Sequence, residues 1–439
     1  MVLNKLREKL TTRDATAAVV GLGYVGLPLA MAYVAAGYRV IGYDVDETKI
    51  AALRAGRSYV GDVGDEEIKA AAAAGRFEAT TDPGRLAAAD VIAVCVPTPL
   101  HPNKDPDLSY LLNTARTLAA HLRPGQLVVV ESTVYPGATR EEVLPVLEAG
   151  GLRSGRDFWL AFSPERVDPG NHAFPLAKIP TVVGGIDGTA TELAAAFYAP
   201  VVTKVVSVSS AEAAEMSKLV ENIYRAVNIA LVNELKVICH RMGLDVFEVL
   251  AAAATKPYGF QSFTPGPGVG GHCIPLDPYY LSWRARRFGV ESQFVELAGT
   301  VNDAMPAYVV GRLAGALGDR GVETAGAKVL VLGVAYKADV DDLRESPALE
   351  VLELLLKAGM RVDYHDSYAP ILPRVRKHDL RMKSVPLTAA SLAAYDAVVI
   401  LTDHTNVDYG IVFRTARLVV DTRGVARRLG VDGANVVAA

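Results

Sequence analysis

The chain of 439 residues is about half apolar and carries a formal charge of −4 at pH 7, which leaves room for about three domains. Without a basic stripe, this charge balance argues against a nucleic-acid partner. Cys95, Cys239 and Cys273 are too few and too scattered for a disulfide framework, which suits a cytoplasmic protein. The charged start MVLNKLREKL lacks a signal peptide's apolar core, and no apolar run approaches the length of a membrane span.

The first part of the chain alternates between strand and helix patterns. Apolar runs at 17–20, 91–97, 127–131 and 181–184 are separated by alanine-rich helical stretches. Runs that are apolar throughout are typical of strands buried on both faces of a parallel sheet. We therefore expect a doubly wound parallel sheet here.

Beyond this block the pattern changes twice. A long helix is expected over 211–242, with further helices over 246–254 and 279–288, and a second strand–helix–strand block begins at Lys328. The predicted fold class is α/β, with two Rossmann-like doubly wound parallel-sheet domains joined by a central helical domain. The three domains are expected at residues 1–207, 208–305 and 306–439.

A glycine motif follows the first predicted strand. Gly21, Gly23 and Gly26 form G-x-G-x-x-G at the start of a helix, where they permit a tight turn, a close pyrophosphate approach and helix–strand packing. Asp44 ends the next strand 18 residues after Gly26; it can accept both ribose hydroxyls and would repel a 2′-phosphate, which favours NAD over NADP. A Rossmann unit that binds another ligand is the alternative. The candidate cofactor residues of this segment are Gly21, Gly23, Tyr24, Val25, Gly26 and Asp44.

Polar residues follow the later strands of the same block. Thr98 lies in CVPTPL, Thr133 in ESTVYPGAT, and the pair Glu165 and Arg166 in SPERVDPGN. The carboxyl ends of parallel strands face the ligand crevice, so both threonines are candidates to touch cofactor or substrate. Plain turn hydroxyls and a solvated charge pair are the alternatives.

The long central helix carries a polar stripe. Glu215, Lys218, Asn222 and Arg225 are spaced three, four and three residues apart and share one face. Such a stripe is usually a solvent face. Because the other faces are rich in apolar residues, we expect a helix buried on most sides whose polar stripe lines a cavity.

The segment GPGVGGHCIPLDPYYL places Cys273 in a loop rich in glycine and proline, just before Asp277 and the start of a helix. A thiol near a helix N-terminus and a lysine has its thiolate favoured, and Gly270 removes a side chain from the approach. A dyad with His272 is disfavoured because adjacent residues rarely aim their side chains at one another. No metal site is expected, since the spacing is not that of zinc ligands.

These motifs come in the order and spacing of a known family. GLGYVGLP, CVPTP, KLVENIYRAVNIALVNE, GPGVGGHCIPLDP and GVAYKADVDDLRESP resemble the nucleotide-sugar 6-dehydrogenases of the UDP-glucose/GDP-mannose dehydrogenase family over nearly the whole chain. The resemblance implies an N-terminal NAD domain, a central helical domain that forms a homodimer, and a C-terminal domain that binds a UDP-sugar. It also implies a twofold, NAD-dependent oxidation of a sugar C6 alcohol to a carboxylate.

The resemblance assigns roles to individual residues. Cys273 would be the nucleophile that holds the aldehyde as a thiohemiacetal and then a thioester. Lys218 and Asn222 would stabilise developing oxyanion charge, and Asp277 would order water and Lys218. Thr133 and Glu165 match positions for water-mediated proton transfer and thioester hydrolysis.

Further residues are expected around substrate and cofactor. Lys337 and Arg344, in AYKADVDDLRES, resemble residues that hold the substrate and the closed cofactor site. The candidate substrate-binding residues are Glu165, Arg166, Lys218, Asn222, Arg225, Gly270 and Lys337. Thr98, Thr133 and Arg344 complete the cofactor candidates.

Departures from the family pattern bear on the sugar. UDP-glucose dehydrogenases typically have lysine where this chain has Leu276, whereas the loop resembles the branch that oxidises UDP-N-acetylhexosamines. Residues 256–260 differ from the run usual in the N-acetylmannosamine enzymes, which favours UDP-N-acetylglucosamine. UDP-glucose, UDP-N-acetylmannosamine and a non-catalytic NAD-binding regulatory role are the alternatives.

Overall fold

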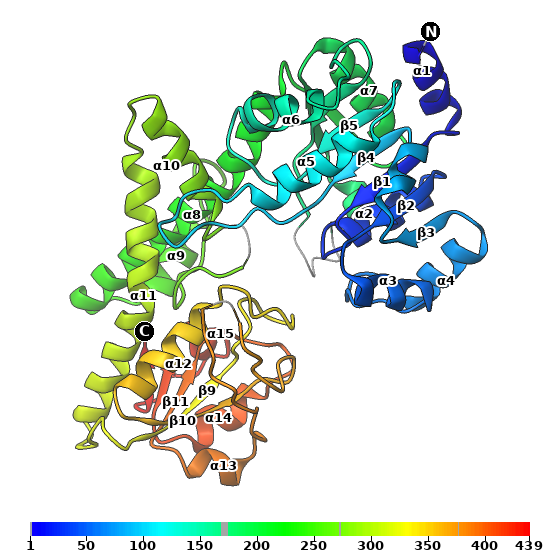
Figure 1. Ribbon diagram of the computed structural model, residues 1–439. Coiled ribbons are helices and arrows are strands. Elements are labelled where there is room, and N and C mark those ends of the chain that lie inside the picture. The colour runs from blue at the N-terminus through cyan, green and yellow to red at the C-terminus, as the bar shows by residue number, and fades with distance from the viewer. Residues whose placement is uncertain (1, 168–173, 272–273, 376) are drawn as a thin grey trace. The chain divides into compact units, whose positions relative to one another are not determined.

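The computed structural model describes residues 2–167, 174–271, 274–375 and 377–439, and the chain falls into two compact units (Figure 1). The first unit comprises Met1–Glu221 and Tyr279–Val290, and the second comprises Asn222–Pro278 and Glu291–Ala439. This division runs through the long central helix rather than setting it apart. The boundaries of the three expected domains therefore stay predictions.

The described part of the first unit is built on an eight-stranded sheet of order β3-β2-β1-β4-β5-β6-β7-β8. The strands are β1 Thr16–Val20, β2 Arg39–Tyr43, β3 Phe77–Thr80, β4 Val91–Val94, β5 Leu127–Val130, β6 Trp159–Phe162, β7 Thr181–Gly185 and β8 Val205–Ser207. Neighbouring strands are parallel, except that β7 runs antiparallel to β6. Antiparallel neighbours need no crossover helix, and the described residues between β6 and β7 hold only a short helical turn, Leu176–Lys178.

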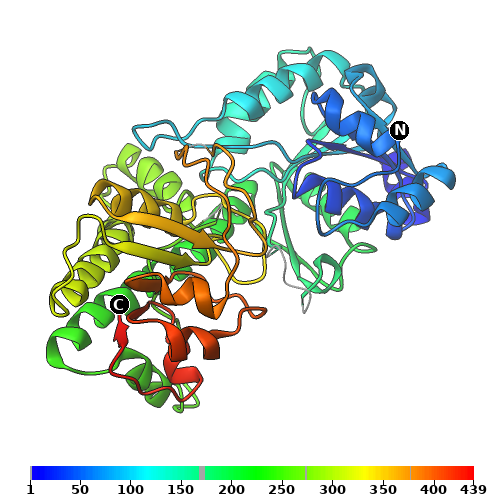
Figure 2. The same ribbon diagram turned by 90° about the horizontal axis from the view of Figure 1, so that it is seen from below.

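Helices cover both faces of this sheet, as Figure 2 shows, so its central strands are buried on both sides. The helices of the first unit include α1 Val2–Thr12, α2 Gly26–Ala35, α3 Glu47–Arg54, α4 Asp65–Ala73, α5 Ser109–His121, α6 Leu144–Glu148 and α7 Gly188–Tyr198. Residues 127–130 are fully buried, which explains why their run is apolar without alternation. The core against α2 and α7 includes Tyr33, Phe197 and Tyr198, whose rings meet edge to face.

In the described part of the chain, a run of helices without strands follows the first sheet, as the sequence indicates. They are α8 Ala211–Met242, α9 Val246–Ala253, α10 Asp277–Arg287 and α11 Gln293–Gly318. The expectation that α8 is buried on most sides is wrong, because Tyr224, Leu231, Ile238 and Met242 are each 45% exposed or more. These residues are spaced by seven and four positions, so they form one exposed apolar face of the helix.

The second unit contains a five-stranded parallel sheet of order β10-β9-β11-β12-β13, as far as the chain is described. Its strands are β9 Lys328–Leu332, β10 Arg361–His365, β11 Ala397–Ile400, β12 Val419–Asp421 and β13 Val436–Ala438. Its helices are α12 Pro347–Lys357, α13 Ala389–Ala393, α14 Tyr409–Thr415 and α15 Val425–Arg428. The predicted second strand–helix–strand block is therefore confirmed, with α12 between β9 and β10.

The two sheets share a local design at the end of their first strand. Gly21 follows β1 with φ +92°, and Gly333 follows β9 with φ +77°, a backbone region that side chains disfavour. In each sheet an aspartate after the next strand accepts a hydrogen bond from the amide that follows the glycine, Asp44 at 2.8 Å and Asp366 at 2.7 Å. Both units are thus Rossmann-like, but only in the first does G-x-G-x-x-G directly follow the first strand of the sheet.

Candidate active site

The glycine turn after β1 has the shape that a pyrophosphate needs. A Cβ on Gly21 would lie 2.7 Å from the carbonyl oxygen of Cys95, and one on Gly26 would lie 1.8 Å from the carbonyl oxygen of Gly21. A Cβ on Gly23 would meet nothing within 4 Å. The open space beside Gly23 and the first amides of α2 are where a bound pyrophosphate would find room and donors.

Asp44 is held in place at the end of β2. It is 7% exposed, and its carboxylate accepts the amides of Leu22 at 2.8 Å and Asp46 at 3.0 Å and pairs with Lys49 at 3.0 Å. The backbone donors fix the acid beside the glycine turn, where a ribose would lie. These residues fit NAD, which supplies hydride acceptance when bound.

The other predicted cofactor residues lie near this turn or at later strand ends. Tyr24 and Val25 precede α2 and are 51% and 37% exposed. Thr98 follows β4 and is buried, and its carbonyl oxygen accepts the Tyr280 hydroxyl at 2.8 Å. Thr133 follows β5 and is half-buried. All four lie in the first unit, at the carboxyl edge of the sheet or the start of α2.

Glu165 lies after β6 beside a buried lysine. Burial raises the pKa of Glu165, while the amide of Val167 and the charge of Lys218 oppose that rise. Lys218 is 7% exposed, and its Nζ donates to the carbonyl oxygen of Glu165. Arg166 forms an ion pair with Glu221 at 2.8 Å. The structure thus brings together the acid and the ammonium that the sequence predicted separately.

Asn222 lies one helical turn after Lys218 on α8. Its Nδ2 donates to Oδ2 of Asp277 at 2.5 Å, and Asp277, which begins α10, is 4% exposed. Arg225, the next member of the predicted stripe, is exposed. The stripe therefore does not have one uniform environment, since only its first half is buried.

Glu215, the first residue of that stripe, has a structural role. It is fully buried, and its carboxylate accepts the amides of Gly137 at 2.6 Å and Thr139 at 2.9 Å. Burial raises its pKa to about 7, against the effect of these hydrogen bonds. Glu215 thereby fastens the turn after Thr133 to α8.

The loop before Cys273 is anchored from α8 by residues that the sequence analysis missed. The amide of Gly266 donates to Asn233 at 2.9 Å, and its carbonyl oxygen accepts from Lys236 Nζ at 2.8 Å. Lys236 is 4% exposed, and burial lowers its pKa to about 7. A lysine and an asparagine within the apolar run of α8 are the signal that could have revealed this contact. His272 and Cys273 themselves lie outside the described residues.

The far end of the loop packs against the segment after β9. The amide of Gly271 donates to the carbonyl oxygen of Arg344 at 3.2 Å, and a Cβ on Gly270 would lie 2.7 Å from Cβ of Tyr336. Gly270 therefore allows the loop backbone to lie close to Tyr336, where a side chain would clash. Arg344 pairs with Asp342 at 2.6 Å, and Lys337 is half-buried in the same segment.

A Rossmann sheet with a fitted dinucleotide turn, followed by long helices and a second Rossmann-like sheet, defines an NAD-dependent dehydrogenase. The sequence matches the UDP-glucose/GDP-mannose dehydrogenase family in its NAD binding domain at residues 15–202, its central domain at 212–304 and its UDP binding domain at 330–428. The chain belongs to this family and is an NAD-dependent nucleotide-sugar 6-dehydrogenase. A UDP-sugar is accordingly its substrate.

Named relatives align along most of the chain. UDP-N-acetyl-D-glucosamine 6-dehydrogenase of Pseudomonas aeruginosa is 37% identical, over 90% of this chain and 91% of that protein. UDP-N-acetyl-D-mannosamine dehydrogenase of Pyrococcus horikoshii is 36% identical, over 96% and 95%. A solved structure of the UDP-D-ManNAc dehydrogenase from Pyrococcus horikoshii superimposes with a TM-score of 0.86 at 33% identity, covering 96% of this chain and 98% of that one.

Among the described residues, no helix combines the length and the apolar character that a bilayer span requires.

Proposed function

We propose that this enzyme oxidises the C6 hydroxyl of a UDP-N-acetylhexosamine, UDP-N-acetylglucosamine, to the uronate in two successive two-electron steps. The observation that carries the proposal is the buried Lys218, whose ammonium lies against Glu165 in the first unit. A buried cation beside an acid of raised pKa is expected where negative charge develops on a reacting oxygen. Lys218 and Asn222 would present two donors to that oxygen from successive turns of α8.

In the first step the C6 hydroxyl loses its proton while a hydride leaves C6. Thr133 and Glu165 are proposed to pass this proton through water, because each follows the end of a strand at the carboxyl edge of the sheet. Lys218 and Asn222 would stabilise the alkoxide-like oxygen. Asp277 would hold the Asn222 amide in one orientation through the hydrogen bond between them.

In the second step the thiolate of Cys273 is proposed to add to the aldehyde. A C–S bond forms, and the resulting thiohemiacetal carbon can lose a second hydride to become a thioester. Water then attacks the thioester carbon, Glu165 takes the proton of that water, and the C–S bond breaks to release carboxylate and thiolate. The anchoring of the loop at Gly266 by Asn233 and Lys236 supports a fixed approach of the segment that precedes this cysteine.

The choice of sugar draws on two kinds of support. Leu276 stands where UDP-glucose enzymes typically carry a lysine, and a relative of 37% identity is named for UDP-N-acetylglucosamine. The relative named for the mannosamine epimer is 36% identical, so UDP-N-acetylmannosamine is the second candidate. UDP-glucose is the remaining alternative for the sugar.

A substrate panel tests the proposal. Purified enzyme with NAD⁺ is given limiting UDP-N-acetylglucosamine, UDP-N-acetylmannosamine or UDP-glucose, and NADH absorbance is followed to completion. We expect the highest kcat/KM with UDP-N-acetylglucosamine and two NADH per sugar. A preference for either other sugar, or no turnover with any of the three, would refute the assignment of substrate.

We further propose that the enzyme is a homodimer formed through its central helices. The exposed apolar face of α8, made of Tyr224, Leu231, Ile238 and Met242, supports this proposal. Contiguous apolar patches of this kind mark protein–protein contacts. A second copy of the same face would cover it under twofold symmetry.

A further inference from the structure

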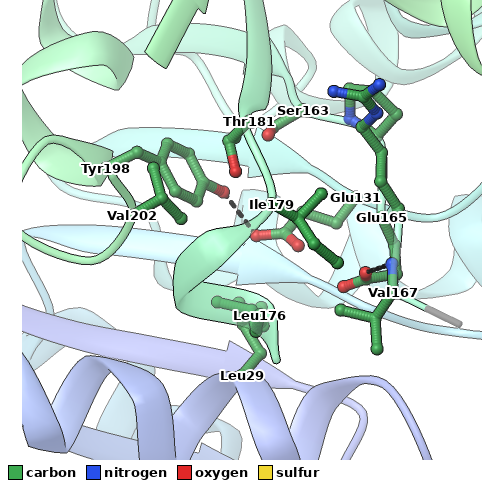
Figure 3. Close-up of a pocket in the computed structure, with 12 residues that line it drawn as sticks. Leu29, Glu131, Ser163, Glu165, Val167, Leu176, Ile179, Thr181, Tyr198 and Val202 are labelled. Atoms are coloured by element: carbon green, nitrogen blue, oxygen red, sulfur yellow. Dashed lines mark hydrogen bonds between the residues drawn. The ribbon is translucent and has the colours of Figure 1, made fainter. Parts of the chain in front are cut away.

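A small cavity lies at the carboxyl edge of the first sheet, between the ends of β5 and β6 (Figure 3). Its volume of about 20 Å³ is enough for one water molecule. Two acids line it, Glu131 directly after β5 and Glu165 after β6, with apolar walls from α2 and from the segment before β7. Glu165 is part of the proposed hydrolysis step, whereas Glu131 has no role in the mechanism described so far.

Glu131 is buried with neutral partners. It is 4% exposed, and its Oε1 accepts the hydroxyl of Tyr33 at 2.9 Å and the hydroxyl of Tyr198. Both tyrosines thus use the same oxygen, which leaves Oε2 to carry a proton or to bind water. Figure 3 shows the carboxyl group of Glu131 within the cavity wall, with Tyr198 on one side of it.

The titratable groups around this acid act on its ionised form in opposite directions: the charge of Glu165 disfavours it, whereas the hydroxyls of Tyr33 and Tyr198 favour it by donating hydrogen bonds. Tyr33 comes from α2, Tyr198 from α7, Cys95 from the end of β4 and Glu165 from the loop after β6. Arg166 also lines the cavity, but its guanidinium pairs with Glu221. Two buried acids beside one cavity cannot both ionise easily, because each carboxylate would repel the other away from bulk water.

The electrostatics agree with this geometry. Burial, followed by the charge of Glu165, raises the pKa of Glu131 to about 8, against the lowering effect of the hydrogen bonds from Tyr198 and Tyr33. Burial also raises the pKa of Glu165, but the amides of Val167 and Arg166 and the charge of Lys218 oppose that rise. A charged lysine and two amides thus support the carboxylate form of Glu165, whereas Glu131 has no cationic partner among these causes and its raised pKa favours the protonated form near pH 7.

We propose that Glu131 is a positioning residue that stays protonated beside Glu165. Its O–H donates a hydrogen bond to a water in the cavity, and that water donates to Glu165. This arrangement stabilises Glu165 as the carboxylate that accepts a proton during thioester hydrolysis. The inference rests on the proposed function of Glu165. In that step the attacking water gives its proton to Glu165, the C–S bond breaks and thiolate leaves. Glu131 keeps its own proton throughout and forms no bond to the substrate.

The neutral donor, rather than the acid itself, is what this role requires. Glu131→Gln retains a neutral donor of the same length, whereas Glu131→Leu removes the donor and keeps the bulk. Without the hydrogen bond the Glu165 carboxylate loses stabilisation, so the acid limb of the hydrolysis rate against pH shifts upward by about one unit. On the acidic side of this pH profile, where the rate rises with pH, Glu131→Leu should hydrolyse the thioester about tenfold more slowly than Glu131→Gln. The two rates should converge at higher pH.

The test is single-turnover release of uronate, quenched after the NADH burst, in full-length wild type, Glu131→Gln, Glu131→Leu and Tyr198→Phe between pH 5.5 and about 8.5. We expect wild type, the Gln variant and Tyr198→Phe to share one acid limb, because Tyr198 contacts only Oε1 of Glu131. A Leu variant whose acid limb coincides with wild type would overturn the proposal. An equal loss of the hydrolysis rate at every pH in Glu131→Leu would also overturn the proposal, since a residue with a purely structural role gives that result.

An infrared measurement on the wild type does not depend on how the Leu variant folds. At pH 7 we expect the C=O band of a protonated carboxyl group that is absent from Glu131→Gln, and no such difference would contradict the inference. Failure of the underlying function has a separate signature, because wild type would then release no uronate from any UDP-sugar.

Discussion

The glycine turn after β1 predicts different effects for a glycine-to-alanine substitution at Gly23 and at Gly26. Gly23→Ala adds a methyl group that meets no protein atom within 4 Å, so the fold should tolerate it. The methyl group would instead occupy the space left for the pyrophosphate. Gly26→Ala places its Cβ 1.8 Å from the carbonyl oxygen of Gly21, so α2 must move away from the turn.

The two magnitudes follow from these contacts. Losing one or two hydrogen bonds to a charged phosphate costs about 1.5–3 kcal/mol, so Gly23→Ala should weaken NAD⁺ binding roughly 10- to 100-fold. Overpacking at Gly26 should cost about 1–3 kcal/mol of folding free energy, a fall in Tm of several degrees for a unit of this size.

Calorimetric titration with NAD⁺ and thermal unfolding without ligand separate the two effects. We expect Gly23→Ala to keep the wild-type Tm and lose affinity, and Gly26→Ala to lose Tm. Equal Tm losses in both variants would refute the reasoning, as would undiminished NAD⁺ affinity in Gly23→Ala.

Three other predictions concern buried charge, the loop anchor and self-association. The pKa of Glu215 is higher in the folded than in the unfolded protein, so its ionisation lowers the free energy of unfolding as pH rises from about 4.5 to about 7, by roughly 3 kcal/mol at most. Unfolding measured against pH should show this loss in wild type but not in Glu215→Gln. Lys236→Met leaves the Gly266 carbonyl without its donor, and we expect kcat to fall about tenfold with NAD⁺ affinity unchanged; an unaltered kcat would contradict the anchoring role. Leu231→Glu should give monomers in sedimentation velocity while Val45→Glu, at a 79% exposed apolar residue of the first unit, should not, and a dimeric Leu231→Glu enzyme would refute the interface.

The central sheet strands and the cofactor turn could be predicted from local sequence. Val91–Val94 and Leu127–Val130 are apolar throughout because both faces of the sheet are covered. G-x-G-x-x-G followed by Asp44 is typical of a dinucleotide-binding turn. Strand β6, whose run WLAF is short, was not predicted, and the direction of β7 depends on a connection that leaves no periodic signal.

The candidate site was predictable in part. Lys218 and Glu165 are 53 residues apart, and only the fold brings the ammonium to the backbone of the acid. The roles of Asn233 and Lys236 as anchors of Gly266, and that of Glu131 beside the cavity, arise from contacts between elements distant in sequence. The burial of α8 was misjudged because an apolar helical pattern does not reveal whether the chain's own elements cover that face or leave it exposed.

The central proposal is a covalent acyl intermediate on Cys273, and a variant that slows its hydrolysis should allow it to accumulate. Glu165→Gln enzyme, mixed with NAD⁺ and UDP-N-acetylglucosamine, is quenched after the NADH burst, digested and analysed by mass spectrometry. We predict two NADH per active site and a peptide containing Cys273 that carries the acylated UDP-sugar, absent from the Cys273→Ser, Glu165→Gln double variant. Two NADH per site with an unmodified Cys273 peptide would contradict the account.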